Sequence, residues 1–311
     1  MRVLIIGGTR FIGPYIARHL LAHGHEVIAL NRGKSPGLLP DEVVRVYCDK
    51  NDREKFKADL TNLKFDAVID TCLEADDLKF VVPLLEGHIS HFIHTSSTGV
   101  YAPIRRLPAR EEDKIEIVEG ITFIHKWEQD KVLLEAHQRS GFPATIMRPS
   151  NIYGPGDVPL DIWGARNPKF FQRLIDHRPI AIPNDGRALF QPGYAEELTE
   201  TFALALENQK SIGDIFNVSS PRALTLNEYV RLIAEILGSR SRTYYIPVEE
   251  LIALYEEDGT INPVGARFVC EHMCIDISKA RQELGYEPKI SLEEGMERNI
   301  QWMFDQGLIQ R

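Results

Sequence analysis

Cysteine is scarce in this chain, with four residues among 311, at Cys48, Cys72, Cys270 and Cys274. So few cysteines do not build the disulfide scaffold of a secreted protein of this size, and their use is typical of a reducing cytosol. Long apolar runs are missing too. The run Val3–Ile6 gives way at once to Gly7 and Gly8 and is too short for a signal-peptide core or a membrane span. We therefore expect a cytoplasmic protein that does not enter a membrane.

An excess of positive charge is also absent. The 36 lysines and arginines face 45 aspartates and glutamates, which gives a formal net charge of −9. A phosphate backbone is bound largely by cationic side chains, so the composition argues against a nucleic-acid partner. The most basic short run, Arg105–Arg110, is followed directly by Glu111, Glu112 and Asp113, and we interpret it as a solvated loop.

The rest of the composition is ordinary for a globular protein, with 43% hydrophobic and 26% charged residues. The length suggests about two domains. Short apolar runs alternate with segments of helical periodicity. The runs predict strands at residues 3–6, 26–30, 43–47, 65–70, 91–95, 144–147 and 215–218. The longer segments predict helices at residues 11–23, 168–177, 226–237 and 292–304.

Continuous apolar strands separated by helices predict βαβ crossovers, and hence an α/β fold with a doubly wound parallel sheet. After Arg148 the sequence becomes rich in Gly, Pro and Asp. We therefore expect a dinucleotide-binding domain at residues 1–150, with returning segments at about 189–218. A smaller C-terminal substrate-binding lobe would comprise residues of about 151–188 and 219–311.

The segment Gly7-Gly8-Thr9-Arg10-Phe11-Ile12-Gly13 follows the first predicted strand and opens the first helix. Glycines at this junction allow a tight turn and a close approach of the backbone to a pyrophosphate, which then lies at the helix N-terminus. An ordinary strand–helix turn is the alternative, but the position in a βαβ unit favours a Rossmann-fold site for NAD or NADP.

Positive charge follows the second predicted strand, where NAD-binding units usually have an acidic residue for the ribose 2′-hydroxyl. This chain has Asn31, Arg32 and Lys34 there, and Arg10 lies in the glycine segment. Arginine suits a 2′-phosphate, so we predict a preference for NADP over NAD. The alternative is that Arg10 and Arg32 are solvated surface charges.

Further motifs follow the glycine segment in order: Cys48-Asp49, Thr95–Tyr101, Arg148–Asp157 and Leu284–Pro288. Together they span nearly the whole chain, which resembles the extended short-chain dehydrogenases/reductases of the NAD-dependent epimerase/dehydratase type. The form of the glycine segment is most similar to an atypical branch that includes plant chloroplast stem-loop RNA-binding proteins.

The resemblance implies roles for individual residues. Asp49 would accept from the adenine amino group, and Ser97 would hydrogen-bond the reacting oxygen. Lys131, in Lys-x-x-x-Glu, would hold the nicotinamide ribose. The tyrosine expected four residues earlier is replaced by Trp127. An indole does not ionise in a useful range, so the proton relay would be atypical. His125, Lys126, Tyr101 and Tyr153 are other possible proton donors.

Three residues are candidates for substrate binding. Asn151 matches a family asparagine that contacts nucleotide sugars, while Arg187 and Arg267 are candidate anion clamps. An arginine–histidine pair usual in sugar-nucleotide epimerases is replaced by Phe190 and Tyr194.

The segment Cys270-Glu271-His272-Met273-Cys274 could offer three metal ligands on one face of a strand. A structural zinc site needs four ligands with wider spacing, so we predict no metal and a half-buried strand instead.

These features lead to two hypotheses. The first is an NAD(P)-dependent oxidoreductase, epimerase or dehydratase that acts on a small hydroxyl or carbonyl substrate, with a nucleotide sugar as one class. The second is a non-catalytic dinucleotide sensor or an RNA-associated protein on the same fold. Unrelated chemistry on this scaffold is a third alternative. The family resemblance also implies a homodimer through the helix that carries Lys131.

Overall fold

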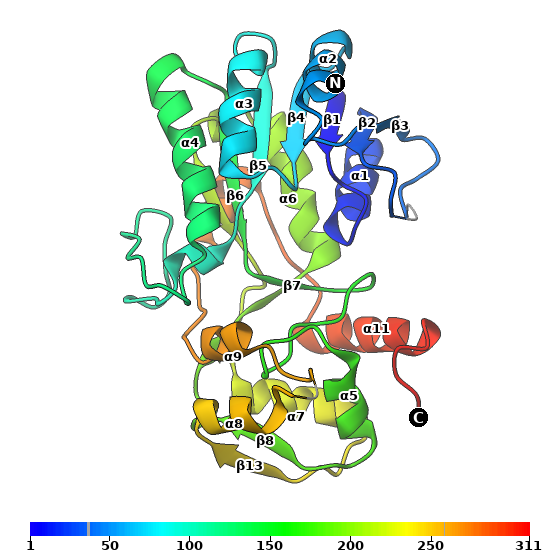
Figure 1. The fold of residues 1–311 in the computed structure, drawn as a ribbon, viewed down its shortest axis with the longest axis vertical. Coiled ribbons are helices and arrows are strands. Elements are labelled where there is room, and N and C mark those ends of the chain that lie inside the picture. Colours follow the sequence, from blue (N-terminus) through cyan, green and yellow to red (C-terminus); the bar gives the residue numbers. More distant parts are fainter. Residues whose placement is uncertain (36–37, 258) are drawn as a thin grey trace.

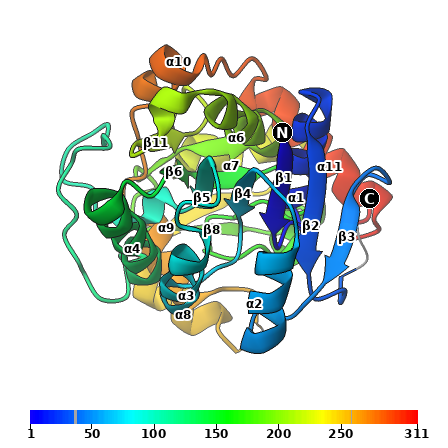
Figure 2. The same ribbon diagram turned by 90° about the horizontal axis from the view of Figure 1, so that it is seen from above.

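The apolar runs form one parallel sheet in the order β11-β6-β5-β4-β1-β2-β3 (Figures 1 and 2). The computed structural model describes residues 1–35, 38–257 and 259–311. The strands of this sheet are β1 (Arg2–Ile6), β2 (Glu26–Asn31), β3 (Val44–Tyr47), β4 (Ala67–Asp70), β5 (His91–Thr95), β6 (Ala144–Pro149) and β11 (Ile215–Val218). The predicted doubly wound α/β fold is confirmed.

Helices cover both faces of the sheet (Figure 2). One face packs against α1 (Ile12–Ala22), α6 (Ala195–Glu207) and α10 (Ser278–Leu284). The other face packs against α2 (Arg53–Asn62), α3 (Ala75–Leu85) and α4 (Ile124–Ser140). Successive side chains of a strand point to opposite faces, so Val3 and Ile5 belong to the first layer while Leu4 and Ile6 belong to the second. This double burial explains why the strands are continuously apolar.

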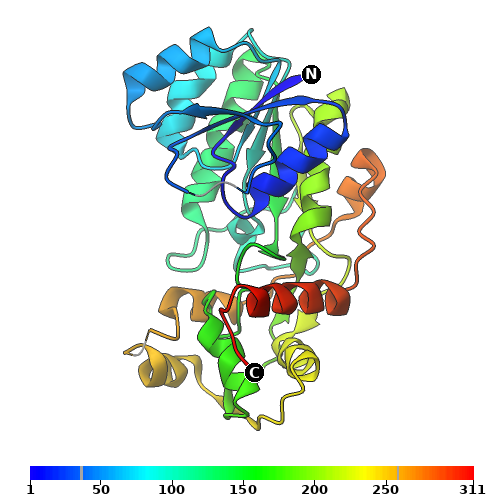
Figure 3. The same cartoon turned by 90° about the vertical axis from the view of Figure 1, so that its right-hand side faces the viewer.

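A smaller lobe lies beyond the carboxyl ends of the strands (Figures 1 and 3). Its helices are α5 (Pro168–Ile175), α7 (Leu226–Ile236), α8 (Val248–Tyr255), α9 (Pro263–Val269) and α11 (Leu292–Asp305). Its strands pair as β7 (Asn151–Tyr153) with β10 (Pro192–Tyr194), β8 (Ile180–Pro183) with β13 (Thr243–Ile246), and β9 (Leu189–Phe190) with β12 (Leu224–Thr225). The division of the chain near residue 150 stays a prediction.

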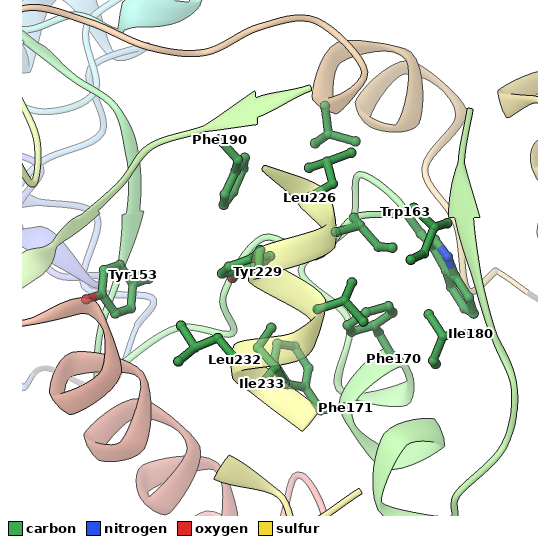
Figure 4. Packing of buried hydrophobic residues seen from close by; sticks show 14 of the residues in the cluster. Tyr153, Trp163, Phe170, Phe171, Ile180, Phe190, Leu226, Tyr229, Leu232 and Ile233 are labelled. Atoms are coloured by element: carbon green, nitrogen blue, oxygen red, sulfur yellow. The ribbon is translucent and has the colours of Figure 1, made fainter. Parts of the chain in front are cut away.

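An aromatic cluster forms the core of the lobe (Figure 4). Trp163 is fully buried, donates from Nε1 to the Ala181 carbonyl at 2.8 Å, and meets Phe170 edge to face. Tyr229 packs against Phe190 at a centroid distance of 4.8 Å. None of the helices in the described residues has both the length and the apolar character that a bilayer span needs.

The predicted strand at Cys270–Cys274 is wrong. Cys270 ends helix α9, and its amide donates to the Arg267 carbonyl at 3.2 Å, so the chain continues in a turn. The segment then runs along β9, where the Met273 amide donates to the Leu189 carbonyl at 2.7 Å. The prediction relied on the alternation of residues 270, 272 and 274. The turn that ends helix α9 at Cys270 prevents this segment from starting as a strand.

A buried ion pair fixes helix α4 on the sheet. The guanidinium of Arg148, on β6, is 1% exposed and donates from Nε and Nη2 to the Asp130 carboxylate at 3.0 and 2.9 Å. Its Nη1 donates to the Tyr101 hydroxyl at 2.6 Å, and that hydroxyl donates to Asn217 at 2.9 Å. The cluster therefore joins α4, β6, β11 and the short 3₁₀ helix η1 (Thr98–Tyr101).

Removing one charge of this pair should destabilise the protein strongly. In Asp130→Asn, the guanidinium of Arg148 stays buried without its counter-ion, a change that typically costs about 3–5 kcal/mol. We expect a loss of that size in the free energy of urea unfolding. Glu128→Gln, an exposed carboxylate of the same helix, should change it by less than about 0.5 kcal/mol. Equal stabilities of the two variants would show that the cluster does not hold α4.

Candidate functional site

A groove of about 380 Å³ opens at the carboxyl ends of β1, β2, β3 and β4. We call it the strand-end groove. It brings together seven of the predicted cofactor residues: Gly7, Thr9, Arg10, Ile12, Asn31, Arg32 and Asp49. Open α/β sheets bind ligands at this edge, because the crossover helices begin there.

The glycine turn shapes one wall of the groove. Gly7 and Gly8 have φ values of 95° and 72°. Residues other than glycine rarely adopt these backbone angles. Gly13 packs so tightly that a Cβ there would lie 2.1 Å from the Gly8 carbonyl oxygen. Helix α1 then begins without a side-chain hydrogen bond at its N-cap, Phe11. An uncapped helix N-terminus approached by bare backbone suits a pyrophosphate.

Cations line the rim of the groove after β2. Arg10 donates from Nε to the Ser35 hydroxyl at 3.0 Å, which joins the glycine turn to the loop after β2. Asn31 is buried and accepts from the Gly33 amide at 2.8 Å, so it shapes this loop. Arg32 and Lys34 are exposed and line the groove beside it.

The opposite wall contains Lys50 and Cys72, which sequence reasoning missed. Lys50 donates from Nζ to the Cys72 carbonyl at 2.9 Å and pairs with Asp77 of α3. Burial favours the neutral acid, but hydrogen bonds from Lys50, the Glu74 amide and Arg53 hold the pKa of Asp77 below its usual range. Cys72 is exposed as a residue, but its sulfur lies 3.6 Å from the Ile6 carbonyl, and this partial desolvation raises the pKa of the thiol to about 12.

A buried acid supports the turn between β4 and the groove. Asp70 accepts from the amides of Cys72 and Leu73, each at 2.8 Å, and from Nδ1 of His94 at 2.7 Å. Both side chains of the Asp70–His94 pair are essentially inaccessible to solvent. The sequence signal for this role of Asp70 was its position as an acidic residue at the end of an apolar strand.

Ser97 lies further along the same edge, after β5. It is half-buried and its Oγ accepts from the Gly99 amide at 3.1 Å. Lys126 of α4 donates from Nζ to the Thr95 carbonyl at 2.8 Å, which places its ammonium at the end of β5. The hydroxyls of Thr95 and Ser96 are buried and have no hydrogen-bond partner in the described part of the chain. Such groups usually pair with a ligand or with water.

The structure does not bring Lys131 to this edge, which corrects its expected placement. Lys131 is exposed and lines a separate groove with Glu74 and Asp76 of the α3 end and His125 and Glu128 of α4. The physical reason is the rotation of the helix: Asp130 faces Arg148 and Leu133 faces the core. Lys126, Asp130 and Leu133 are spaced by four and three residues, which is the spacing of side chains on one face of a helix. This spacing was the sequence signal for the face of α4 that points to the sheet.

Two of the aromatic residues named as possible proton donors or tyrosine replacements, Trp127 and Tyr101, lie at the Arg148 cluster. Trp127 is half-buried and lies with its ring 6.0 Å from the Arg148 guanidinium carbon. Tyr101 uses its hydroxyl in the Arg148 cluster, and burial raises its pKa to about 12. Burial also raises the pKa of Tyr153. Relative to Lys126, the position four residues earlier, where the family tyrosine is expected, is Thr122. Its hydroxyl donates to the Ala102 carbonyl at 2.6 Å.

The three residues predicted to bind substrate have different surroundings. Asn151 starts β7 and its buried Nδ2 has no partner among the described residues. Arg187 is exposed, with its guanidinium 3.9 Å from Asp185. Arg267 donates from Nε and Nη2 to both carboxylate oxygens of Glu249, at 2.8 and 2.7 Å, so its fork is already occupied.

The family comparison agrees with this geometry. The model of the "NAD dependent epimerase/dehydratase family" matches residues 3–79 and 75–219. Among relatives, a chloroplast stem-loop binding protein of 41 kDa from Arabidopsis thaliana is 31% identical over the whole of this chain and 81% of its own length. A UDP-N-acetyl-α-D-glucosaminuronate decarboxylase from Bacillus cytotoxicus is 24% identical over 97% of both chains.

Solved structures show the same fold. A UDP-glucose 4-epimerase from Thermotoga maritima, determined with UDP-glucose, has a TM-score of 0.79 at 21% identity and covers 98% of this chain and 99% of its own. A dTDP-glucose 4,6-dehydratase from Streptomyces venezuelae, determined with NAD bound, also scores 0.79 at 21% identity, over 100% and 99% of the two chains.

Proposed function

Since the chain belongs to the NAD-dependent epimerase/dehydratase family, we propose that it is a dinucleotide-dependent enzyme acting on a small hydroxyl or carbonyl substrate. The observation that carries this proposal is the alignment of the strand-end groove, Ser97 and Lys126 along one edge of the sheet. Relatives whose names include UDP-sugar enzymes support a nucleotide sugar as the substrate class.

The cofactor fits the residues present. Because Gly7, Gly8 and Gly13 carry no side chain, the pyrophosphate could approach the start of α1, while Asp49 would hold the adenine and Arg10 with Arg32 a 2′-phosphate. When bound, the nicotinamide supplies a donor or acceptor of hydride. The unpartnered hydroxyls of Thr95 and Ser96 support placing the nicotinamide end near β5.

Two side chains would serve the reacting end. Ser97 would donate a hydrogen bond to the reacting oxygen, because its hydroxyl only accepts from the Gly99 amide and keeps its proton free. Lys126 replaces Lys131 in the lysine role and would hold the ribose hydroxyls. With Thr122 engaged and Trp127 beside Arg148, the proton relay would not follow the tyrosine pattern. Asn151 would contact substrate from β7.

An RNA-associated role is the second candidate, supported by the name of the 31% identical stem-loop binding protein. At the far end of the small lobe, the Arg240 amide donates to His177 at 3.3 Å and the Arg242 carbonyl accepts from Ile180 at 2.9 Å. These contacts bring together two segments that carry the exposed residues Arg178, Arg240, Arg242 and Tyr244. Cations beside an aromatic ring can bind single-stranded loops, although the net charge of −9 opposes this role.

Lys126 and Lys131 give a direct test of the lysine assignment. A charge-assisted hydrogen bond is worth about 1.5–3 kcal/mol, so Lys126→Met should weaken NADPH and NADH binding about tenfold or more. Lys131→Met should bind as the wild type does. Cofactor fluorescence measures both affinities, and thermal melting checks the fold. If only Lys131→Met weakened cofactor binding, Lys131 and not Lys126 would hold the ribose.

The same variants test the reaction. We expect the wild type to transfer deuterium from 4-deuterated NADPH or NADH to a carbonyl compound, or from a carbon-deuterated sugar nucleotide to NADP+ or NAD+, and Lys126→Met to transfer much less. Mass spectrometry of the products measures the label. A wild type that binds the cofactor tightly but labels nothing in a broad panel would favour the non-catalytic alternative.

Arg32 tests the preference for NADP. Loss of an arginine–phosphate contact should raise the Kd of NADPH about 10–100-fold in Arg32→Ala, with little effect on NADH. Lys57→Ala, an exposed cation on α2, should change neither affinity. Calorimetric titration measures the four values. Equal weakening of NADPH and NADH in Arg32→Ala would rule out the 2′-phosphate contact.

The RNA alternative predicts affinity at physiological salt. If it holds, a labelled RNA stem-loop should bind at about 0.15 M salt. A triple alanine variant at Arg178, Arg240 and Arg242 should lose at least about tenfold in affinity, since each phosphate contact adds to binding. Fluorescence polarisation measures the affinity, with Lys57→Ala as control. Absence of binding by the wild type would exclude this role.

A further inference from the structure

Phe11 has a strained backbone in the middle of the glycine turn. Its φ and ψ are 40° and −93°, a left-handed conformation that residues with side chains rarely adopt. Such a conformation persists only where the surrounding structure holds it. The Phe11 side chain lies against a segment of the small lobe.

A segment of the small lobe, residues 154–166, touches the start of helix α1; we call it the bridging loop. The guanidinium carbon of Arg166 lies 5.8 Å from the centre of the Phe11 ring. Gly156 is also close, because a Cβ added to it would meet Phe11 Cδ2 at 3.6 Å. One turn along α1, Tyr15 donates its hydroxyl to the Pro155 carbonyl at 2.8 Å.

Arg166 also organises the bridging loop itself. Its Nη1 donates to the Val158 carbonyl at 2.9 Å and its Nη2 to the Ile152 carbonyl at 3.0 Å. Its charge is paired with Asp157 at 3.3 Å. Ile152 follows Asn151 on β7, so a single guanidinium connects the ring of Phe11 with the strand that carries the proposed substrate residue.

Helix α11 closes the other side of the loop. Asn299 is fully buried, accepts from the Gly154 amide at 2.9 Å and donates to the Asp157 carbonyl at 3.1 Å. The bridging loop is therefore attached at one side to the C-terminal helix and at the other to the cofactor turn.

We propose that the Phe11–Arg166 contact couples the two sites, so that cofactor bound at the glycine turn orders the bridging loop and the strand carrying Asn151. The inference rests on the proposed function. An anion that accepts from the amides at the start of α1 fixes the strained backbone of Phe11, and this fixes the ring against which Arg166 lies. Arg166 is thus a positioning residue. Coupling is reciprocal, so a ligand on the loop would strengthen cofactor binding by the same factor.

Hydrogen–deuterium exchange of the full chain tests the coupling without a substrate. NADPH or NADH, whichever binds, should slow amide exchange both at residues 7–13 and at residues 151–166 of the wild type. We expect about fivefold or more at the loop, the usual lower range of coupling between sites. In Arg166→Met and Phe11→Leu, protection should persist at residues 7–13 and disappear at residues 151–166.

Controls separate coupling from damage. Arg231→Met, an exposed arginine on α7, should keep the wild-type pattern, and Arg166→Lys should restore only part of the loop protection because it lacks the two-carbonyl fork. Protection confined to residues 7–13 in the wild type, or full loop protection in Arg166→Met, would overturn the coupling while leaving the proposed function intact. Failure of the wild type to bind either dinucleotide, measured beforehand by cofactor fluorescence, would overturn the proposed function and the coupling with it.

Discussion

The buried guanidinium of Arg148 determines how the rest of the site is arranged. A charge that is 1% exposed is tolerated only with a full set of partners, and Asp130 and the Tyr101 hydroxyl supply them. Because Asp130 belongs to α4 and Tyr101 to η1, the pair fixes both elements against β6. The rotation of α4 follows from this contact. It directs Lys126 to the end of β5 and leaves Lys131 on the outer surface.

A second constraint operates at the opposite end of the same edge. The glycine turn can approach a phosphate only because three positions lack a side chain, and Gly13 has no room for one against Gly8. The strand-end groove is completed by contacts between distant segments, such as Arg10 with Ser35 and Lys50 with Cys72. The groove and the serine–lysine end thus lie on one sheet edge, while the bridging loop connects that edge to the small lobe.

Much of this arrangement could be predicted from the sequence. Strands that are apolar at every position indicate burial on both faces, and β11 was predicted at Ile215–Val218 with the bounds it has. The glycine segment and Asp49 were predicted to serve one site, and they line one groove. The lysine was harder, because two Lys-x-x-x-acid patterns occur in succession, at Lys126–Asp130 and Lys131–Glu135. Five residues of α-helix rotate a side chain by roughly 140°, so the two patterns face different directions.

The sequence by itself determined the elements, the parallel sheet and the position of the dinucleotide turn, because these depend on periodicity and on glycines within short segments. Tertiary structure alone decided which lysine reaches the sheet edge, which arginines stay available, and which segments touch across the lobes. Arg267 illustrates the reason. Its partner Glu249 lies 18 residues away on another helix, so no local sequence pattern predicts the ion pair. The neighbours of Phe11 likewise come from more than a hundred positions along the chain, because only folding brings Gly156 and Arg166 against it.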